Sequence, residues 1–247
     1  MKSKDSKAEI ENTNIITIDG PAGSGKSTIA KRLAKEMNLV YIDTGAMYRA
    51  LTLIALENNI NLNDSKAILD AAKKVVLEFD KSVGDINQYT KVLLNGRDIT
   101  MDIRSKKVGA AVSIVSKLPE VRKYLVKLQR DMALKKPCVL EGRDTGSVVC
   151  PVAVCKIFLT ASINERVRRR QKQLIENSQP ASKNEIKSEI ENRDKIDSGR
   201  EDSPLVIPES ATVIDTSNMS VEDVFNSIKN DYNEKLNRSN IKKTSKQ

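Results

Sequence analysis

The 247-residue sequence contains no histidine and no tryptophan, and only 3% of its residues are aromatic. Without histidine, the chain has no histidine general base, no Ser-His or Cys-His nucleophile pair and no His-ligated metal. Its chemistry must therefore depend on carboxylates, lysine, arginine and a metal ion held by oxygen atoms. The scarcity of aromatics also predicts a core made mainly of Ile, Val, Leu and Ala.

Cysteine is scarce as well: Cys138, Cys150 and Cys155 are odd in number and lack C-x-x-C spacing. They lie in or beside apolar runs, which indicates reduced, buried thiols rather than a disulfide or a zinc site. No apolar stretch reaches the length of about 18 residues that a membrane span needs. Residues 1–14 mix both charge signs without an apolar segment, so we expect a disordered N-terminal extension. We predict a cytoplasmic protein with no membrane partner.

Much of the positive charge, +9 overall, lies at one end of the chain. Residues 232–247 hold five basic residues against one acidic residue, which accounts for +4 of that total. Such a basic, polar segment predicts a solvated, disordered C-terminal tail. Because the basic residues are not interleaved with aromatics that could stack on bases, we expect no nucleic-acid partner.

Strand and helix patterns alternate along the chain, which is typical of an α/β fold with a mainly parallel sheet covered by helices on both faces. One large domain is predicted over residues 15–231. Its five core strands are expected at residues 15–19, 39–43, 138–144, 154–160 and 211–217.

Residues 62–103 interrupt this alternation. They show a helical pattern and then two strands with antiparallel alternation and an Asn95-Gly96 turn signal. Because such strands cannot join a parallel sheet without long crossovers, we interpret the segment as an inserted lobe. A second interruption, residues 176–185, is predicted to be a mobile polar loop between two helices.

The segment "GPAGSGKS" matches the phosphate-binding pattern G-x-x-x-x-G-K-[ST] between a predicted strand and a predicted helix. Its glycines let backbone N–H groups point inward, the helix dipole adds positive potential, and Lys26 adds a cation. A purely structural glycine turn is the alternative. The segment predicts an ATP site made by Gly20, Pro21, Ala22, Gly23, Ser24, Gly25, Lys26, Ser27 and Thr28, with the Ser27 hydroxyl available to Mg²⁺.

The motif does not identify the acceptor of the phosphoryl group, and no guanine-reading N-K-x-D is present. Two segments rich in polar residues follow predicted strands, at the sheet edge where open α/β sheets bind ligands. "DTGAMYRA" holds Thr44, a candidate N-cap, and Arg49, and "EGRDTGSVV" holds Arg143 and Asp144. A solvated arginine and a salt-bridged loop are the alternatives.

Two further arginine segments lie on predicted helices. One places Arg193, Asp197 and Arg200 at i, i+4 and i+7 on one helical face, and the other holds Arg166, Arg169 and Arg170. Each segment alone also fits an ordinary surface helix. Four such segments together with a phosphate-binding loop favour phosphoryl transfer between polyanions.

In combination, "ITIDGPAGSGKST", "DTGAMYR", "EGRDTGSVV" and the Arg193-Asp197-Arg200 pattern resemble the bacterial cytidylate kinases, a family of nucleoside monophosphate kinases, over about residues 15–229. The resemblance implies a P-loop kinase fold whose inserted lobe, residues 62–103, enlarges the monophosphate site and whose short lid spans about residues 166–200. It implies ATP-dependent phosphorylation of CMP and dCMP by direct in-line transfer, with Mg²⁺ carried by ATP.

The resemblance also implies residue roles. Catalytic roles fall on Lys26, Arg49, Arg143 and Arg200, and further ATP contacts on Arg166, Arg169 and Arg170. Substrate binding falls on Thr44, Arg49, Ser113, Arg122, Arg143, Asp144, Arg193, Asp197 and Arg200. A carboxylate can accept from the cytosine amino group, which uracil lacks, so Asp144 should discriminate between the two bases. Asp43 and Glu141 are the candidates for supporting the metal.

The chain departs from the family pattern at Thr145 and Ser147, where an aliphatic residue and threonine are more usual, which leaves fine specificity open. Two other functions stay open. A P-loop kinase for another small acceptor, such as UMP or shikimate, shares most of these features. An ATPase stimulated by nucleic acid through the basic tail would be a different class. We expect a monomer that acts on ATP and CMP or dCMP.

Overall fold

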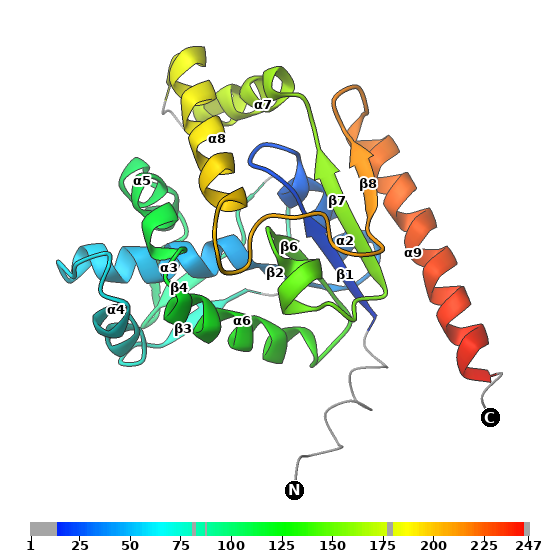
Figure 1. Ribbon diagram of the computed structural model, residues 1–247, viewed down its shortest axis with the longest axis horizontal. Coiled ribbons are helices and arrows are strands. Elements are labelled where there is room, and N and C mark those ends of the chain that lie inside the picture. The colour runs from blue at the N-terminus through cyan, green and yellow to red at the C-terminus, as the bar shows by residue number, and fades with distance from the viewer. Residues whose placement is uncertain (1–13, 81–82, 87, 177–179, 245–247) are drawn as a thin grey trace, which may run out of the picture.

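The computed structural model describes residues 14–80, 83–86, 88–176 and 180–244. Its centre is a five-stranded sheet in the order β2-β6-β1-β7-β8 with every neighbouring pair parallel (Figure 1). This confirms the predicted α/β class and all five core strands. Residues 1–13 of the predicted N-terminal extension lie outside the described residues. The strands are β1 (Ile15–Asp19), β2 (Val40–Asp43), β6 (Cys138–Gly142), β7 (Cys155–Thr160) and β8 (Thr212–Asp215).

The side chains on the two faces of the sheet pack into two different apolar clusters, because successive residues of a strand point to opposite sides. Ile16 and Ile18 of β1 pack with helices α2 (Lys26–Glu36) and α9 (Val221–Thr244). Ile15 packs on the other face with helix α6 (Pro119–Ala133) and the short helical turn η2 (Thr145–Val149). Asp19 shares the face of Ile15 and therefore reaches η2 at the edge where the strands end.

Helix α9 contradicts the prediction of a disordered tail. The helix continues past residue 232 to Thr244, so that prediction is wrong for residues 232–244, while residues 245–247 lie outside the described part. Tyr232 is 5% exposed and packs with Phe225 and Ile228 in the core beneath the sheet. A helix that is already held by packing propagates at little cost, even through a basic segment.

The inserted lobe contains helix α4 (Ser65–Ala72) and a separate antiparallel sheet in the order β3-β4-β5. The sequence pattern predicts only two of its strands, because β3 reads as the end of the helical segment. Asn95 and Gly96 have φ of 50° and 81°, as a two-residue hairpin turn requires. The three strands are β3 (Leu77–Phe79), β4 (Val92–Leu94) and β5 (Arg97–Asp98).

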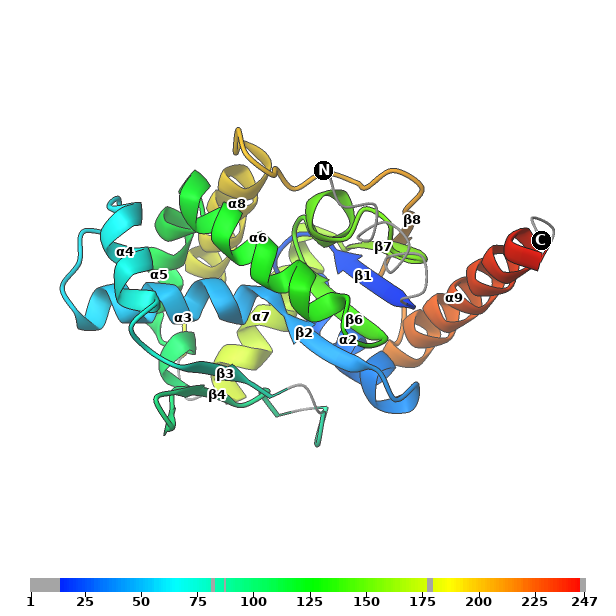
Figure 2. The same ribbon diagram turned by 90° about the horizontal axis from the view of Figure 1, so that it is seen from below.

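The lobe does not share the core of the main sheet. It packs on helices α3 (Thr44–Glu57) and α5 (Lys106–Val115), and the turn η1 (Asp102–Arg104) at its end joins them around a second apolar cluster. Figure 2 shows α4 at one end of the molecule and α9 at the other. Strands β1, β2 and β6, whose carboxyl ends lead into the P-loop, α3 and the segment before η2, lie between these two ends.

The predicted lid is a pair of helices, α7 (Ile163–Glu176) and α8 (Lys183–Ser198), above the carboxyl ends of the strands (Figure 1). A small apolar cluster that includes Val167 and Ile190 holds them together. The predicted mobile loop is shorter than expected, since α7 runs to Glu176 and Ser182 caps α8; residues 177–179 lie outside the described part. Within the described residues, none of the helices combines the length and the apolar character of a membrane span.

Candidate active site at the carboxyl end of the sheet

The predicted phosphate-binding loop connects β1 to α2, as the mechanism requires. Gly20 has φ of 147°, and a Cβ at this position would lie 2.0 Å from the carbonyl oxygen of Leu159 on the neighbouring strand. Gly25 precedes the first turn of α2 with a left-handed φ of 92°. The loop therefore lies flat on the sheet with its amide groups at the start of a helix, which is a ready anion site.

Lys26 lies over this loop. Its Nζ donates to the carbonyl oxygen of Pro21 at 2.7 Å and to Ser24 Oγ at 3.4 Å. Burial lowers the pKa of Lys26, and the neighbouring cations Arg143 and Arg193 lower it further. The charged form of a lysine in such surroundings is strongly stabilised when a phosphate group binds beside it.

Ser27 connects the P-loop to strand β6, which lies beside β1 in the sheet. Its Oγ donates to Glu141 Oε2 at 2.8 Å, and Tyr41 donates to the other oxygen of the same carboxyl group. Burial raises the pKa of Glu141, and the negative charge of Asp43 adds to the rise. Glu141 is thus the acidic group beside the Ser27 hydroxyl.

Thr44 is not the N-cap that the sequence pattern predicts. Asp43 caps α3 instead, with its Oδ1 accepting from the amide of Ala46 at 2.8 Å, and the Thr44 hydroxyl donates to the carbonyl oxygen of Glu141 at 2.6 Å. The prediction is therefore wrong by one residue. Asp43 has the extended backbone of an N-cap residue, whereas Thr44 is already the first residue of the helix and its hydroxyl bonds Glu141.

The three lid arginines of α7 have different surroundings. Arg166 donates to the carbonyl oxygen of Ala22 at 3.2 Å and pairs with Asp194 of α8, which also accepts from the amide of Ala22 at 3.3 Å. Arg169 donates to Thr216 Oγ1 at 2.8 Å, and Thr216 in turn donates to the carbonyl oxygen of Ser24 at 3.2 Å. Two of the three arginines thus support the P-loop itself.

Arg170 turns toward the inserted lobe. It donates to Gln173 Oε1 at 2.8 Å, and Gln173 donates to the hydroxyl of Tyr89 at 3.1 Å. The guanidinium of Arg104 lies 4.1 Å from the centre of the Tyr89 ring, and Arg104 also pairs with Asp43 at 3.7 Å. The segment before β4 therefore connects the lobe to the lid.

A second group of cations lies across from the P-loop. Arg143 Nε pairs with Asp197 Oδ2 at 2.8 Å, and Arg200 Nη1 lies 3.6 Å from Asp197 Oδ1. Although burial opposes it, the surrounding Arg143, Arg193 and Arg200 lower the pKa of Asp197. Arg200 lies beyond the end of α8 at Ser198, so the predicted single helical face of Arg193, Asp197 and Arg200 is wrong for Arg200.

Arg49 and Arg193 are the arginines of this group whose pKa values are lowered most. Burial, together with neighbouring cations that include Arg143 and Arg170, lowers the pKa of Arg49 to about 10 and that of Arg193 to about 9. Both stay protonated at neutral pH. Partly buried arginines that repel one another are stabilised by a multiply charged anion, so this cluster is suited to a phosphate group.

The predicted base-reading residues Arg122 and Asp144 lie close to Arg200. Arg122 is 1% exposed and pairs with the buried Asp144, and its Nη1 donates to the carbonyl oxygen of Ser116 at 3.1 Å. Arg122 also lies 5.4 Å from the centre of the Tyr48 ring. Among the described residues, Arg200 Nη2 and Tyr48 Oη are buried without a hydrogen-bond partner, which marks this side for a polar ligand.

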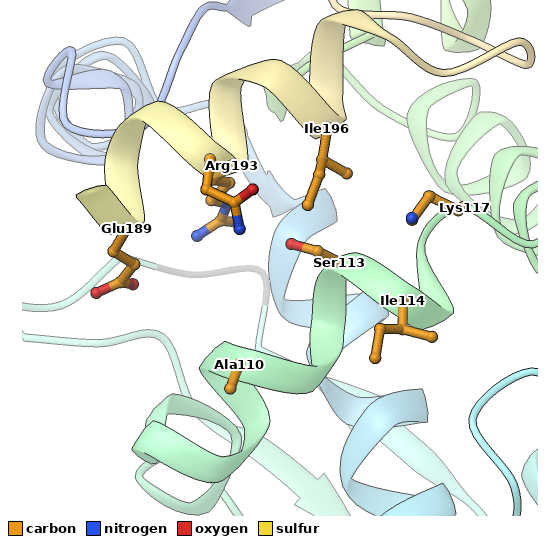
Figure 3. A pocket seen from close by; sticks show the side chains of 8 residues that line it. Ala110, Ser113, Ile114, Lys117, Glu189, Arg193 and Ile196 are labelled. Carbon is orange, nitrogen blue, oxygen red and sulfur yellow. The ribbon is translucent and has the colours of Figure 1, made fainter. Parts of the chain in front are cut away.

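Ser113 faces a cavity of about 220 Å³ between α5 and α8. Figure 3 shows Ser113 and Arg193 on facing sides of this cavity, with Glu189 at one end and Lys117 toward the other. Ser113 is connected to Arg122 only indirectly, because Ser116 Oγ donates to the carbonyl oxygen of Ser113 at 3.4 Å and Ser116 itself accepts from Arg122. The structure thus brings Ser113 to the cavity shared with Arg193.

Sequence reasoning missed three anchoring residues: Asp19, Asp194 and Thr216. Asp194 follows Arg193 and projects from a different face of α8, so its pairing with Arg166 has no signal in the spacing. Thr216 directly follows the strand β8, and only the strand order places it beside the P-loop. Asp19 had a visible signal, a carboxylate at the end of an otherwise apolar buried strand.

A P-loop, a lid with arginines and a cluster of partly buried arginines are the features of a P-loop phosphotransferase, whose donor and acceptor both carry phosphate. The family model for cytidylate kinase matches residues 16–234. Cytidylate kinases of Caldanaerobacter subterraneus subsp. tengcongensis and Desulforamulus reducens are each 48% identical to the chain, over 85% and 86% of it and over 90% and 94% of their own lengths. The chain belongs to the cytidylate kinase family, a family of nucleoside monophosphate kinases.

Among solved structures, a gluconokinase from Sinorhizobium meliloti 1021 is similar at 12% identity and a TM-score of 0.44, covering 91% of this chain and 92% of that one. This likeness is too distant to bear on function.

Proposed function

We propose that the chain phosphorylates CMP and dCMP by direct in-line transfer of the γ-phosphoryl group of ATP, with the P-loop holding the donor and the arginine cluster holding the acceptor. One observation supports this proposal: helix α8 contacts both ends of the site, since Asp194 accepts from the P-loop amide of Ala22 at 3.3 Å and Asp197 pairs with Arg143 at 2.8 Å. A nucleophile and a donor held in one orientation need no covalent intermediate.

On the donor side, the loop amides and Lys26 would hold the ATP phosphates, and Arg166, supported by Asp194, would lie above them. The donor set fits Mg²⁺, because a hydroxyl and a carboxylate are the hard oxygen groups that this ion prefers. Ser27 and Glu141 would hold it, Ser27 directly and Glu141 through the ion's water shell. When it is bound with ATP, the ion neutralises charge on the β- and γ-phosphates.

On the acceptor side, Arg49, Arg143 and Arg200 would hold the 5′-phosphate of the monophosphate. Asp197 keeps Arg143 and Arg200 in place and, with Arg193, would hold the sugar. A phosphate monoester has a second pKa of about 6 and is mostly a dianion at neutral pH. Its oxygen therefore attacks without a general base, which agrees with a chain that has no histidine.

Specificity for cytosine would come from the buried Arg122–Asp144 pair. Ser113 would add a contact from the cavity between α5 and α8 that it shares with Arg193. The Asp144 carboxylate can accept a hydrogen bond from the cytosine amino group. Uracil would place a carbonyl oxygen against the same carboxylate, and a buried acceptor without a donor costs about 1–3 kcal/mol.

Every residue of the proposed site comes from one chain, so a monomer suffices. The three cysteines are free and buried, which fits the reducing cytoplasm. Soluble mononucleotides are the only partners that this site requires.

The test is ADP release with Mg²⁺ and ATP, run in parallel with CMP, dCMP, UMP, AMP, GMP, shikimate, RNA and no acceptor. We expect strong signals with CMP and dCMP, little with UMP and none in the blank. A preference for UMP or shikimate would reassign the acceptor site. ADP release without an acceptor, or only with RNA, would leave the P-loop assignment standing and overturn the role of the arginine cluster.

A further inference from the structure

Asp19 is the last residue of β1 and directly precedes the P-loop, yet its side chain accepts hydrogen bonds from the turn η2. It is completely buried, and its two oxygens accept three hydrogen bonds from the start of η2. Oδ1 accepts from the amide and the hydroxyl of Thr145, both at 2.8 Å, and Oδ2 accepts from the amide of Gly146 at 2.7 Å. A buried carboxylate is costly unless it is satisfied in this way.

These bonds fix the segment that carries two proposed substrate-binding residues. Arg143 and Asp144 are the only residues between the end of β6 at Gly142 and the anchored Thr145. The packing is tight on both sides: a Cβ at Gly142 would lie 2.7 Å from the Thr145 methyl carbon, and a Cβ at Gly146 would lie 2.7 Å from Thr17 Oγ1. The two residues are therefore held at both ends.

Resting on the proposed roles of Arg143 and Asp144, we propose that Asp19 is a positioning residue for the acceptor site, and that the Thr145 hydroxyl completes its anchor in this chain. Thr145 occupies a position at which the sequence departs from the family pattern, and its hydroxyl bond to Asp19 gives that departure a physical role. Asp19 thereby fixes the segment of Arg143 and Asp144 to the end of β1, the strand that leads into the P-loop.

The ionisation of Asp19 offers a signature that a merely structural contact lacks. Burial raises the pKa of Asp19 to about 6, while the Gly146 and Thr145 amides and the Thr145 hydroxyl oppose the rise and the charge of Asp144 adds to it. The other titratable groups close to it are Lys26 in the P-loop and Cys150 after η2. Loss of the Thr145 hydroxyl bond would move the pKa of Asp19 further upward.

The main test compares Thr145→Val, which keeps the shape and removes the hydroxyl, with Thr145→Ser, which keeps the hydroxyl. We measure kcat and the KM values for CMP and ATP, the ratio of kcat/KM for CMP and UMP, and Tm. We expect Thr145→Val to raise KM for CMP about 3- to 10-fold and lower the CMP/UMP ratio, as loss of one charge-assisted hydrogen bond predicts. KM for ATP should change less than about twofold, and Thr145→Ser should behave as the parent.

The second test is the pH profile of kcat/KM for CMP between pH 5 and 8. The fall of kcat/KM on the acid side should occur at higher pH in Thr145→Val than in the parent. In Asp19→Asn the part of this fall that is caused by protonation of Asp19 should be absent. The titration of CMP itself is common to all variants and cancels in their ratios. An unchanged KM for CMP with an unmoved acid-side fall in Thr145→Val, or equal losses for both substrates, would overturn the proposal. Failure of the proposed function is separate, because the parent protein would then not use CMP at all.

Discussion

The proposed donor end of the site consists of nine consecutive residues, Gly20 to Thr28, whereas the proposed acceptor end is drawn from helices α3, α5, α6 and α8, the loop after β6 and the segment after α8. The donor end would bind phosphate with backbone amides and one lysine. The acceptor end would use partly buried arginines, of which Arg49 and Arg193 have pKa values lowered by burial and by neighbouring cations. A single short motif can therefore specify the first site, but the second exists only when several parts of the fold are assembled.

The largest effect should come from Lys26, because the donor end has no second cation in the loop. We expect Lys26→Ala to lower kcat about 10³-fold, in the range found when one preorganised charge-stabilising donor is removed. Folding should be kept, since Lys26 is a buried cation without an ion pair within its loop. ADP release with CMP measures the loss, circular dichroism checks the fold, and Lys229→Ala on α9 is the matched lysine control. A loss below about tenfold would contradict the role.

Arg200→Ala should lower kcat/KM for CMP about 10²- to 10³-fold, because it removes a cation from a transferring phosphate site. The effect should fall on CMP rather than ATP, which separates the two ends of the site. Arg200→Lys should recover only part of the loss, since lysine cannot hold Asp197 and a phosphate with one planar group. Activity equal to the parent in Arg200→Ala would remove this residue from the mechanism.

Stability should respond to pH through Asp19 in the direction opposite to most carboxylates. Its pKa rises from 3.8 to about 6 on folding, so its contribution is fully present below about pH 4 and is lost as the pH rises through 6. The change amounts to ~3 kcal/mol of unfolding free energy. Urea unfolding at pH 4 to 7 measures it as the difference between the parent and Asp19→Asn. A difference that does not vary with pH would show that Asp19 does not titrate in this range.

Asp144→Asn should narrow the CMP/UMP ratio of kcat/KM about tenfold, because an amide can donate to the uracil carbonyl oxygen as well as accept from cytosine. The change also weakens the buried pair with Arg122, so Tm should fall. Parallel assays with both nucleotides measure the ratio, which is unaffected by a uniform loss of folded protein. An unchanged ratio would place the base reader elsewhere.

The smallest effect should come from the contact between the lobe and the lid. Tyr89→Phe removes the hydroxyl that accepts from Gln173 but keeps the ring beside Arg104. We expect about a threefold rise in the KM values, as loss of one partly buried hydrogen bond between neutral groups predicts. Tyr124→Phe on α6, a half-buried tyrosine of the lobe core, serves as the matched control. Equal kinetics in both variants would show that the contact does not help to hold the lid.

Local patterns predicted much of the fold because their causes are local. The five core strands, the helix from the end of β2 to Glu57 and the Asn95-Gly96 turn all follow from apolar runs and turn residues. Strand β3 was hidden because three residues carry too weak a pattern, and α9 because the packing of Tyr232 outweighs a basic composition. Arg200 looked helical from its spacing, but Gly199 ends α8 before it.

By itself, the sequence determined the P-loop, since nine neighbouring residues contain both the backbone freedom and the charge that hold phosphates. It also supplied the arginines and, through resemblance, their family. Only the tertiary structure decided which carboxylate meets which cation: Asp197 with Arg143, Asp144 with Arg122 and Asp194 with Arg166. The strand order decided that Asp19 anchors η2. Pairings between residues far apart in the chain depend on topology, because burial and desolvation act on neighbours in space.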